Sequence, residues 1–166
     1  DVCMTSVVII GGGPGGYEAA LVARQLGADV TVIDRDGLGG AAVLTDVVPS
    51  KGLISVAEVL TRFRESARLG IDSESLATVN LNAVNERLRR LASQQSSDIH
   101  TRLINEHITV IRGTATLNGD REVLVASDAG EHSVSADIIL IATGAQPRVL
   151  ATAIPDGRRI LTWKQL

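Results

Sequence analysis

Residues 6–34 read SVVIIGGGPGGYEAALVARQLGADVTVID, and this stretch decides the fold. The apolar, β-branched run at 6–10 predicts a buried strand, and the Ala- and Leu-rich segment 14–26, which ends at Gly27, predicts a helix. Residues 29–34 alternate apolar and polar side chains, which predicts a second strand. A strand, a glycine turn, a helix and a strand form a βαβ unit, in which the two strands lie parallel and the crossover is right-handed.

The turn between the first strand and the helix contains G-x-G-x-x-G at Gly11, Gly13 and Gly16. Gly11 lets the chain turn sharply, Gly13 leaves the backbone open to a pyrophosphate, and Gly16 lets the helix pack close to the strands. The start of the helix, with Pro14 and Gly15, presents unpaired N–H groups and the positive end of the helix dipole. The turn therefore predicts a binding site for the diphosphate of a dinucleotide.

Asp34 ends the second strand, where a carboxylate is expected to accept hydrogen bonds from both ribose hydroxyls of an adenosine. A carboxylate repels a 2′-phosphate, which argues against NADP at this site. We place Arg35, the next residue, in the same site. The alternative is a glycine-rich turn followed by a surface aspartate, and the βαβ unit alone does not distinguish NAD from FAD.

The remainder of the chain predicts one α/β domain over residues 1–166, with a parallel sheet, flanking helices and a small antiparallel β-meander. The expected elements are a loop or partly extended connection at 37–48, a helix from Pro49 to about Arg68, a polar loop at 71–79, a helix capped by Asn80 and running to about Glu106, a strand at 108–112, meander strands at 114–117, 121–127 and 131–135, and an apolar strand at 137–142.

Composition excludes several classes of protein. The chain is 45% hydrophobic and 21% charged, as expected of a globular domain, and its net charge is −3 without a strong basic run, which argues against nucleic-acid binding. No apolar run is long enough to span a bilayer, and no secretory signal is visible, so a cytoplasmic location is expected. The single cysteine, Cys3, has no partner within the chain, which fits a reducing compartment. The three histidines are not grouped with acids or cysteine, so we expect no metal site.

Three motifs occur in a characteristic order: the glycine turn at 11–16, L-G-G-A-A-V-L-T-D-V-V-P-S-K at 38–51, and A-T-G-A-Q-P at 142–147. Together they resemble the pyridine nucleotide–disulfide oxidoreductase family, class I, which includes dihydrolipoamide dehydrogenase and glutathione reductase. The resemblance covers essentially the whole chain and implies the Rossmann-like FAD-binding domain at the amino end of a larger flavoprotein. It implies FAD as cofactor, NAD(P)H as co-substrate bound by a domain absent here, an absent carboxyl-terminal interface domain, and a homodimer at full length.

The resemblance also implies roles for residues outside the glycine turn. Lys51 matches a lysine beside the flavin N5, where a cation supports negative charge on the reduced ring; the alternative is a solvated helix lysine. Ser50 is expected either to hydrogen-bond the ribityl or phosphate region or to cap the helix. The other residues expected to contact FAD are Gly40 and Ala41 at the flavin edge, Thr114 and Ala115 near the adenine, and Ala142, Thr143 and Gly144 after the last strand.

One departure from the family pattern changes the expected chemistry. Members with a redox disulfide carry cysteines at the positions of Ala42 and Val47, so dithiol–disulfide exchange is chemically unavailable here. The sequence is similar to an actinobacterial branch of NAD(P)H quinone reductases that lacks this pair. We therefore expect FAD to pass electrons from NAD(P)H to a quinone-like acceptor.

Three alternatives stay open: a stand-alone nucleotide-binding module without turnover, a degenerate dihydrolipoamide dehydrogenase-like protein, and an NAD-binding domain without flavin. We also expect the isolated chain to expose apolar surface, to hold flavin weakly or self-associate, and to be inactive by itself.

Overall fold

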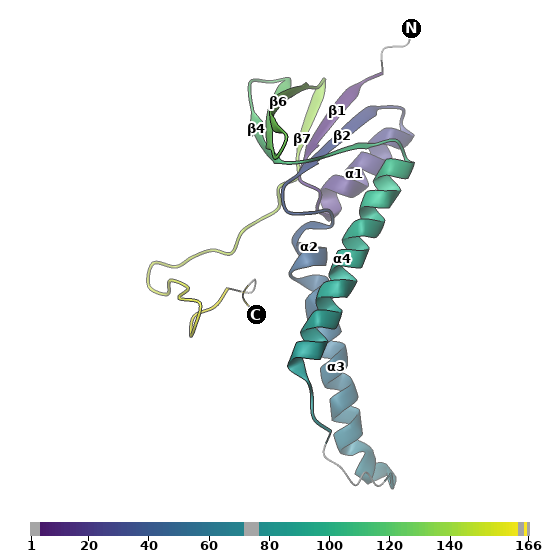
Figure 1. Cartoon of the computed structure of the whole chain (residues 1–166), viewed down its shortest axis with the longest axis vertical. Helices are drawn as coiled ribbons and strands as arrows, with labels where there is room; N and C mark the ends of the chain where they lie inside the picture. Colours follow the sequence, from purple (N-terminus) through teal and green to yellow (C-terminus); the bar gives the residue numbers. More distant parts are fainter. Residues whose placement is uncertain (1–3, 72–76, 163–164, 166) are drawn as a thin grey trace.

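The computed structural model describes residues 4–71, 77–162 and 165 (Figure 1). Cys3 lies outside the described residues, as do residues 72–76 of the expected polar loop and Trp163, Lys164 and Leu166 near the carboxyl end.

The larger of the two sheets is parallel, as the sequence predicts. Its strands are β1 (Ser6–Ile10), β2 (Asp29–Asp34), β3 (Thr109–Arg112) and β7 (Ile138–Ile141), in the spatial order β3-β2-β1-β7. Helix α1 (Pro14–Gln25) connects β1 to β2, whose residues pair from Ser6 with Asp29 to Ile10 with Ile33. The predicted βαβ unit is therefore confirmed.

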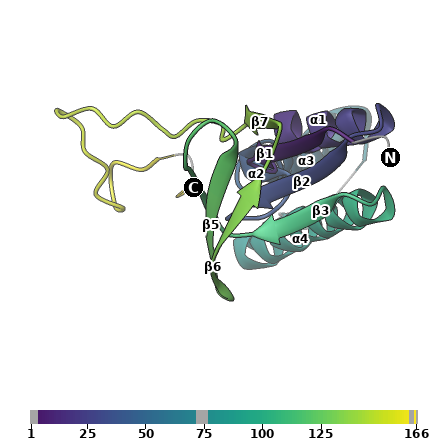
Figure 2. The ribbon, with the colours of Figure 1, turned by 90° about the horizontal axis from the view of Figure 1, so that it is seen from above.

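Successive residues of β1 serve two different cores. Val7 and Ile9 pack with Leu21 of α1 on one face of the sheet, whereas Val8 packs with Val125 on the other face. Figure 2 shows the corresponding layers, with α1 and α4 (Leu81–Asn105) on one side of the sheet and the β5–β6 hairpin on the other. The alternation of side chains along a strand produces this division.

The hairpin belongs to a second sheet, which is the predicted antiparallel meander. It consists of β4 (Thr114–Leu117), β5 (Glu122–Ser127) and β6 (Gly130–Ser135), with β5 in the middle. Gly119 and Gly130, in or next to its two turns, have φ angles of +86° and +110°, which glycine adopts without a steric penalty.

Two helical boundaries differ from the sequence prediction. The expected loop at 37–48 contains a short helix, α2 (Gly40–Leu44), and α3 (Val47–Glu65) begins before Pro49. A proline is tolerated within the first helical turn because its missing N–H has no intrahelical partner there. The chain continues through η1 (Ser66–Leu69). At α4, the Asn80 side chain accepts a hydrogen bond from the Ala83 amide, which confirms the predicted cap.

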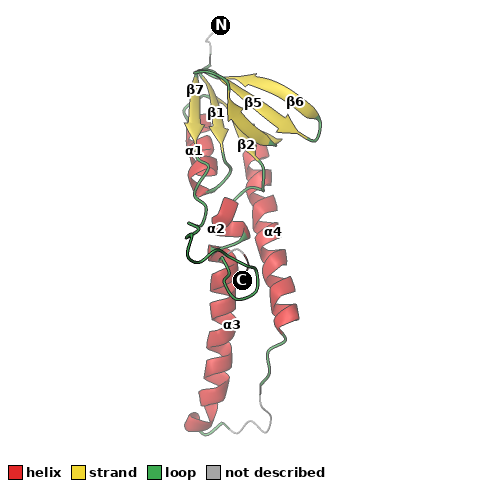
Figure 3. Cartoon of the chain, turned by 90° about the vertical axis from the view of Figure 1, so that its left-hand side faces the viewer, coloured by secondary structure: helices red, strands yellow, loops and turns green. Residues whose placement is uncertain are grey.

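Helices α3 and α4 form an arm that extends away from the sheet (Figures 1 and 3). Helix α3 contains no buried residue, and Val59 in it is 66% exposed. The outer strand β7 also presents Ile138 and Ile141 to solvent, at 53% and 60% exposure. The described residues thus show the exposed apolar surface that the sequence predicts. No helix among them is long and apolar enough to cross a membrane.

Candidate functional site

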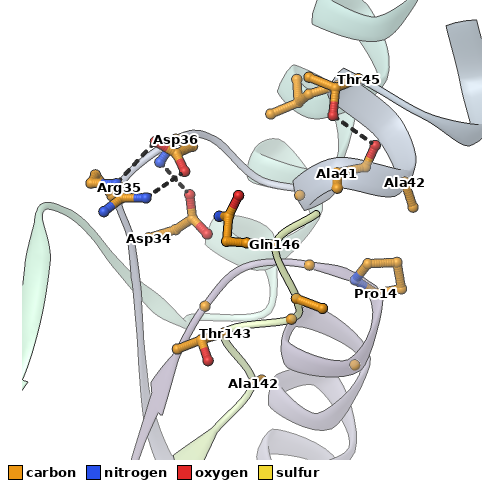
Figure 4. Close-up of a pocket in the computed structure, with 17 residues that line it drawn as sticks. Pro14, Asp34, Arg35, Asp36, Ala41, Ala42, Thr45, Ala142, Thr143 and Gln146 are labelled. Carbon is orange, nitrogen blue, oxygen red and sulfur yellow. Dashed lines mark hydrogen bonds and ion pairs between the residues drawn. The ribbon is translucent and has the colours of Figure 1, made fainter. Parts of the chain in front are cut away.

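A hollow of about 770 Å³ lies where the carboxyl ends of β1, β2 and β7 meet the start of α1 (Figure 4). Its volume falls within the range of about 300–1,000 Å³ that is common for small-molecule sites. This edge of an open α/β sheet is where such folds bind ligands. Its lining residues are Gly11, Gly13, Pro14, Gly15, Asp34, Arg35, Asp36, Gly40, Ala41, Ala42, Leu44, Thr45, Ala142, Thr143, Gly144, Ala145 and Gln146.

Two glycines of the turn are required by the fold itself. Gly11 has a φ of +106°, and a Cβ added to it would lie 2.4 Å from the Ala142 carbonyl oxygen. A Cβ on Gly16 would lie 1.8 Å from the Gly11 carbonyl oxygen. Gly11 therefore makes the turn, and Gly16 lets α1 approach the end of β1, while Gly16 itself lies behind the hollow.

Gly13 has a different role, because the fold does not require it. A Cβ on Gly13 would meet only the Gly40 Cα, at the ordinary contact distance of 4.0 Å, and its φ of −68° suits any residue. The first helical bonds of α1 run from the Gly16 and Tyr17 amides to the Gly13 carbonyl, at 2.9 Å each. The amides of Gly13 and Gly15 precede these bonds, and Pro14 has no N–H, so bare backbone at the positive helix end faces the hollow.

The start of α2 packs directly against this glycine turn. Gly40 has a φ of +54°, and a Cβ on it would lie 2.9 Å from the Gly13 Cα. The two segments thus touch through backbone atoms. The contact places Ala41 and Ala42, which follow Gly40, in the wall of the hollow beside α1.

Asp34 lies half-buried at the end of β2, and backbone amides surround its carboxylate. One oxygen accepts from the Gly12 amide at 2.6 Å, and the other accepts from the amides of Asp36 and Gly37 at 2.9 and 2.5 Å. An ionised carboxylate offers about four acceptor positions. Three backbone amides use part of this capacity and orient the Asp34 carboxylate at the edge of the hollow, and its binding of the ribose hydroxyls stays a prediction.

Arg35 and Asp36 form an ion pair at the rim of the hollow, with 3.0 Å between the Arg35 Nη2 and an Asp36 carboxylate oxygen. The hydrogen bond to Asp36 raises the pKa of the Arg35 guanidinium. Both side chains are largely solvent-exposed, so the pair contributes little to stability. The opposite charges of Arg35 and Asp36 cancel, so this pair adds almost no net charge to the rim.

A second hollow of about 310 Å³ continues from the first past Asp34. Thr114 and Ala115 line it together with Gly113, and it shares Gly11, Asp34, Arg35, Thr143 and Gly144 with the larger hollow. The structure therefore brings Thr114 and Ala115 next to the glycine turn although most of the chain separates them in sequence.

Ser50 and Lys51 do not line either hollow. The Ser50 hydroxyl donates to the Val47 carbonyl at 3.2 Å, within the first turn of α3, and Lys51 is exposed on the same helix. Six lining residues are not among the contacts that the sequence predicts: Asp36, Ala42, Leu44, Thr45, Ala145 and Gln146. Ala145 and Gln146 stand in the A-T-G-A-Q-P motif, which was a usable signal for them.

In the described part of the chain, no group of three or more His, Cys, Asp or Glu side chains is placed to hold a metal ion. What the hollow offers is bare main chain at a helix start, one half-buried carboxylate and small apolar side chains.

Comparison with known proteins gives consistent results. A family model described as pyridine nucleotide-disulphide oxidoreductase matches residues 5–162. The chain is 45% identical to the NAD(P)H dehydrogenase (quinone) of Mycobacterium tuberculosis and 38% identical to the dihydrolipoyl dehydrogenase of Chlorobaculum parvum, with 98% and 96% of this chain covered. The crystal structure of LpdA from Mycobacterium tuberculosis superposes with a TM-score of 0.87 at 42% identity over 98% of this chain. This chain spans only 35%, 34% and 37% of these three proteins, respectively.

Proposed function

The chain belongs to the pyridine nucleotide-disulphide oxidoreductase family, and on that basis we propose that it is the FAD-binding part of a flavoprotein that oxidises NAD(P)H. The observation that carries this proposal is the bare backbone at Gly13, which faces a hollow of about 770 Å³ beside the Asp34 carboxylate. The fold tolerates a side chain at Gly13, so the sterics of the described residues give no reason for the glycine. A diphosphate that approaches the main chain gives such a reason.

The lining residues fit FAD in an extended conformation. The amides of Gly13 and Gly15 would hold the diphosphate, with the positive end of α1 behind them. Asp34 would bind the adenosine ribose, and the hollow at Thr114 and Ala115 would take the adenine. Bound FAD supplies the capacity to accept electrons from NAD(P)H and to pass them on.

Helix α2 would lie beside the flavin end of the cofactor. Gly40 and Ala41 present backbone at the hollow, and Thr45 lines it near the break between α2 and α3. The role predicted for Lys51, stabilising negative charge on the reduced ring, requires the flavin to reach beyond Thr45 to the first turn of α3. Under this proposal Ala142, Thr143 and Gly144 close the site from the end of β7.

The electron acceptor is proposed to be quinone-like. Ala42 lines the hollow, and Val47 begins α3, at the two positions where disulfide-containing members carry cysteines. An alanine and a valine cannot form a thiolate or exchange a disulfide. Electrons would therefore leave FAD directly. The relative named NAD(P)H dehydrogenase (quinone) supports this choice of acceptor. NAD(P)H, the acceptor and a second subunit would contact parts of a longer protein.

The first test is a titration of the purified chain with FAD, followed by flavin fluorescence, with NAD⁺ titrated in parallel. The proposal predicts a yellow complex with FAD and much weaker binding of NAD⁺. A chain that binds NAD⁺ and stays colourless would instead support the NAD-binding alternative.

The second test uses the longer protein in two assays. NADH oxidation is measured with a soluble quinone and with lipoamide, and we expect turnover with the quinone alone. Reduction of lipoamide would contradict the argument from Ala42 and Val47. A longer protein that binds FAD but turns over neither acceptor would favour a nucleotide-binding module.

A further inference from the structure

The turn between β4 and β5 contains Asn118 followed by Gly119, which is the one Asn-Gly pair in the sequence. Both residues are exposed, and Gly119 has a φ of +86°. A Cβ added to Gly119 would have no atom within 4 Å. Among the hydrogen bonds of the described turns and loops, none has the Gly119 amide as its donor. The Gly119 nitrogen is therefore open to solvent and available to the side chain that precedes it.

This pairing permits a spontaneous reaction of the main chain. The Gly119 nitrogen bonds to the Asn118 Cγ, the Cγ–Nδ2 bond breaks, and the Gly119 amide proton leaves with the side-chain nitrogen as ammonia. The product is a succinimide ring, which water opens at either carbonyl carbon to give aspartate or isoaspartate at position 118. Water is the only co-reactant, and no electrons are transferred. Asparagine is a thermolabile residue, and a following glycine leaves the attacking nitrogen unshielded because it has no Cβ.

The other asparagines lack this arrangement, because each of them lies in or caps helix α4 and precedes a residue with a Cβ: Asn80, Asn82, Asn85 and Asn105. Asn105 is the closest comparison, since it is also exposed. The amide that follows it belongs to Glu106 and donates to the Arg102 carbonyl at 3.1 Å. That amide is held by the helix and is not available to attack the Asn105 side chain.

Asn118 also holds the turn to the meander. Its main-chain amide donates to the Glu122 carbonyl at 2.9 Å, and its side-chain amide donates to the Glu122 carboxylate. The same carboxylate accepts a hydrogen bond from the Ser133 hydroxyl of β6. A carboxylate at position 118 could not donate to Glu122 and would repel it, since like charges at such short range are destabilising.

An isoaspartate at position 118 would add a further defect, because it lengthens the main chain by one carbon atom next to β4. The neighbouring pair in the ladder is Leu117 with Val123. Val123 is fully buried and packs in the same core as Val8 of β1. A disturbed register at this end of the meander would therefore loosen one of the two cores.

We propose that Asn118 is a site of spontaneous deamidation and that the reaction weakens the antiparallel meander. The bond from Asn118 to Glu122 restrains the side chain, but it is solvent-exposed, so water competes with it and the side chain is released to react. The modification requires no ligand, so this inference is independent of the proposed function.

The first test follows the reaction itself. The full chain is aged in solution at mildly alkaline pH, and its proteolytic peptides are analysed at intervals by mass spectrometry with separation of aspartate from isoaspartate. The peptide with Asn118 should lose its amide and gain one negative charge well before the peptide with Asn105, which serves as the internal control.

Two variants examine the mechanism of this reaction. Asn118→Gln should lose the conversion, because its longer side chain does not form the succinimide ring. Gly119→Ala should slow the conversion, because a methyl group then shields the attacking nitrogen. An Asn118 that keeps its amide as long as Asn105 would overturn the proposed site, and so would a Gly119→Ala chain that converts as fast as the wild type.

The second test measures the structural consequence by urea unfolding of Asn118→Asp, which reproduces the aspartate product. Its midpoint should fall below that of the matched control Gln95→Glu, which adds the same charge at an exposed position on α4. Adding Glu122→Gln to Asn118→Asp should recover part of the loss, because the facing charge is removed. A midpoint equal to that of Gln95→Glu, or no recovery in the double variant, would overturn the role assigned to the contact with Glu122.

Discussion

Replacing Gly13 with alanine is expected to separate FAD binding from folding. The new Cβ would lie 4.0 Å from the Gly40 Cα, and the φ of −68° at this position is ordinary for alanine. The residue is the N-cap of α1, where alanine is less favourable than glycine by about 1 kcal/mol. The free energy of unfolding should therefore fall by about that amount and no more.

The effect on FAD binding should be larger. The methyl group would project into the hollow at the start of α1 and would keep a diphosphate oxygen away from the backbone amides. Hydrogen bonds to a charged group contribute about 1.5–3 kcal/mol each. Loss of one or two of them corresponds to about 3 kcal/mol, or roughly a 100-fold weaker Kd.

The assay combines an FAD titration by flavin fluorescence with urea unfolding of the same preparation. Gly119→Ala is the matched control, because Gly119 lies in a remote turn with φ +86° and no atom near the new Cβ. It should lose about 1 kcal/mol of stability through the left-handed backbone but keep wild-type FAD affinity. A folded Gly13→Ala chain that binds FAD as tightly as the wild type would refute the placement of the diphosphate on this backbone.

Three further outcomes follow from the structure. Gly16→Ala should abolish cooperative folding or lower the free energy of unfolding by at least about 3 kcal/mol, because its Cβ would lie 1.8 Å from the Gly11 carbonyl oxygen. Urea unfolding measures this loss, and a near-neutral change would contradict the close packing of α1. His107→Gly should stabilise the chain by roughly 0.5–1 kcal/mol, because His107 has a φ of +58° just beyond α4; a thermal scan checks the sign. The amides of Ile160, Arg158 and Arg159 hold the pKa of Asp156 at about 2, below its ordinary 3.8. The bonds of this turn should thus be fully present above about pH 4 and lost as the pH falls through 2, and amide chemical shifts that titrate near pH 3.8 instead would exclude the arrangement.

The sequence predicts the βαβ unit because its signals are local. The alternation of β-branched residues, the glycine turn and the Asn80 cap each depend on a few neighbouring residues, and the structure confirms all three. Helix α2 escapes prediction because Gly39 and Gly40 indicate a loop. Both have positive φ angles, and the glycines permit the tight entry into the helix.

The candidate site is predictable only in part, for a physical reason. The glycine turn and Asp34 follow directly from the βαβ pattern. The hydrogen bonds that occupy the Asp34 carboxylate depend on how residues 36 and 37 return toward it, and no local pattern encodes that path. Gln146 reaches the hollow only through the pairing of β7 with β1, which joins distant parts of the chain.

The side chains of β1 alternate between the two cores, and the same strand leads into the glycine turn of the site. Val7 and Ile9 face the helices, Val8 faces the meander, and the strand delivers Gly11 at its end. A single residue inserted into β1 would exchange these faces and also shift the glycine away from Ala142. The register of β1 thus determines both the packing of the two cores and the position of the glycine turn. A one-residue shift in this strand therefore cannot yield a well-folded protein with a misplaced site.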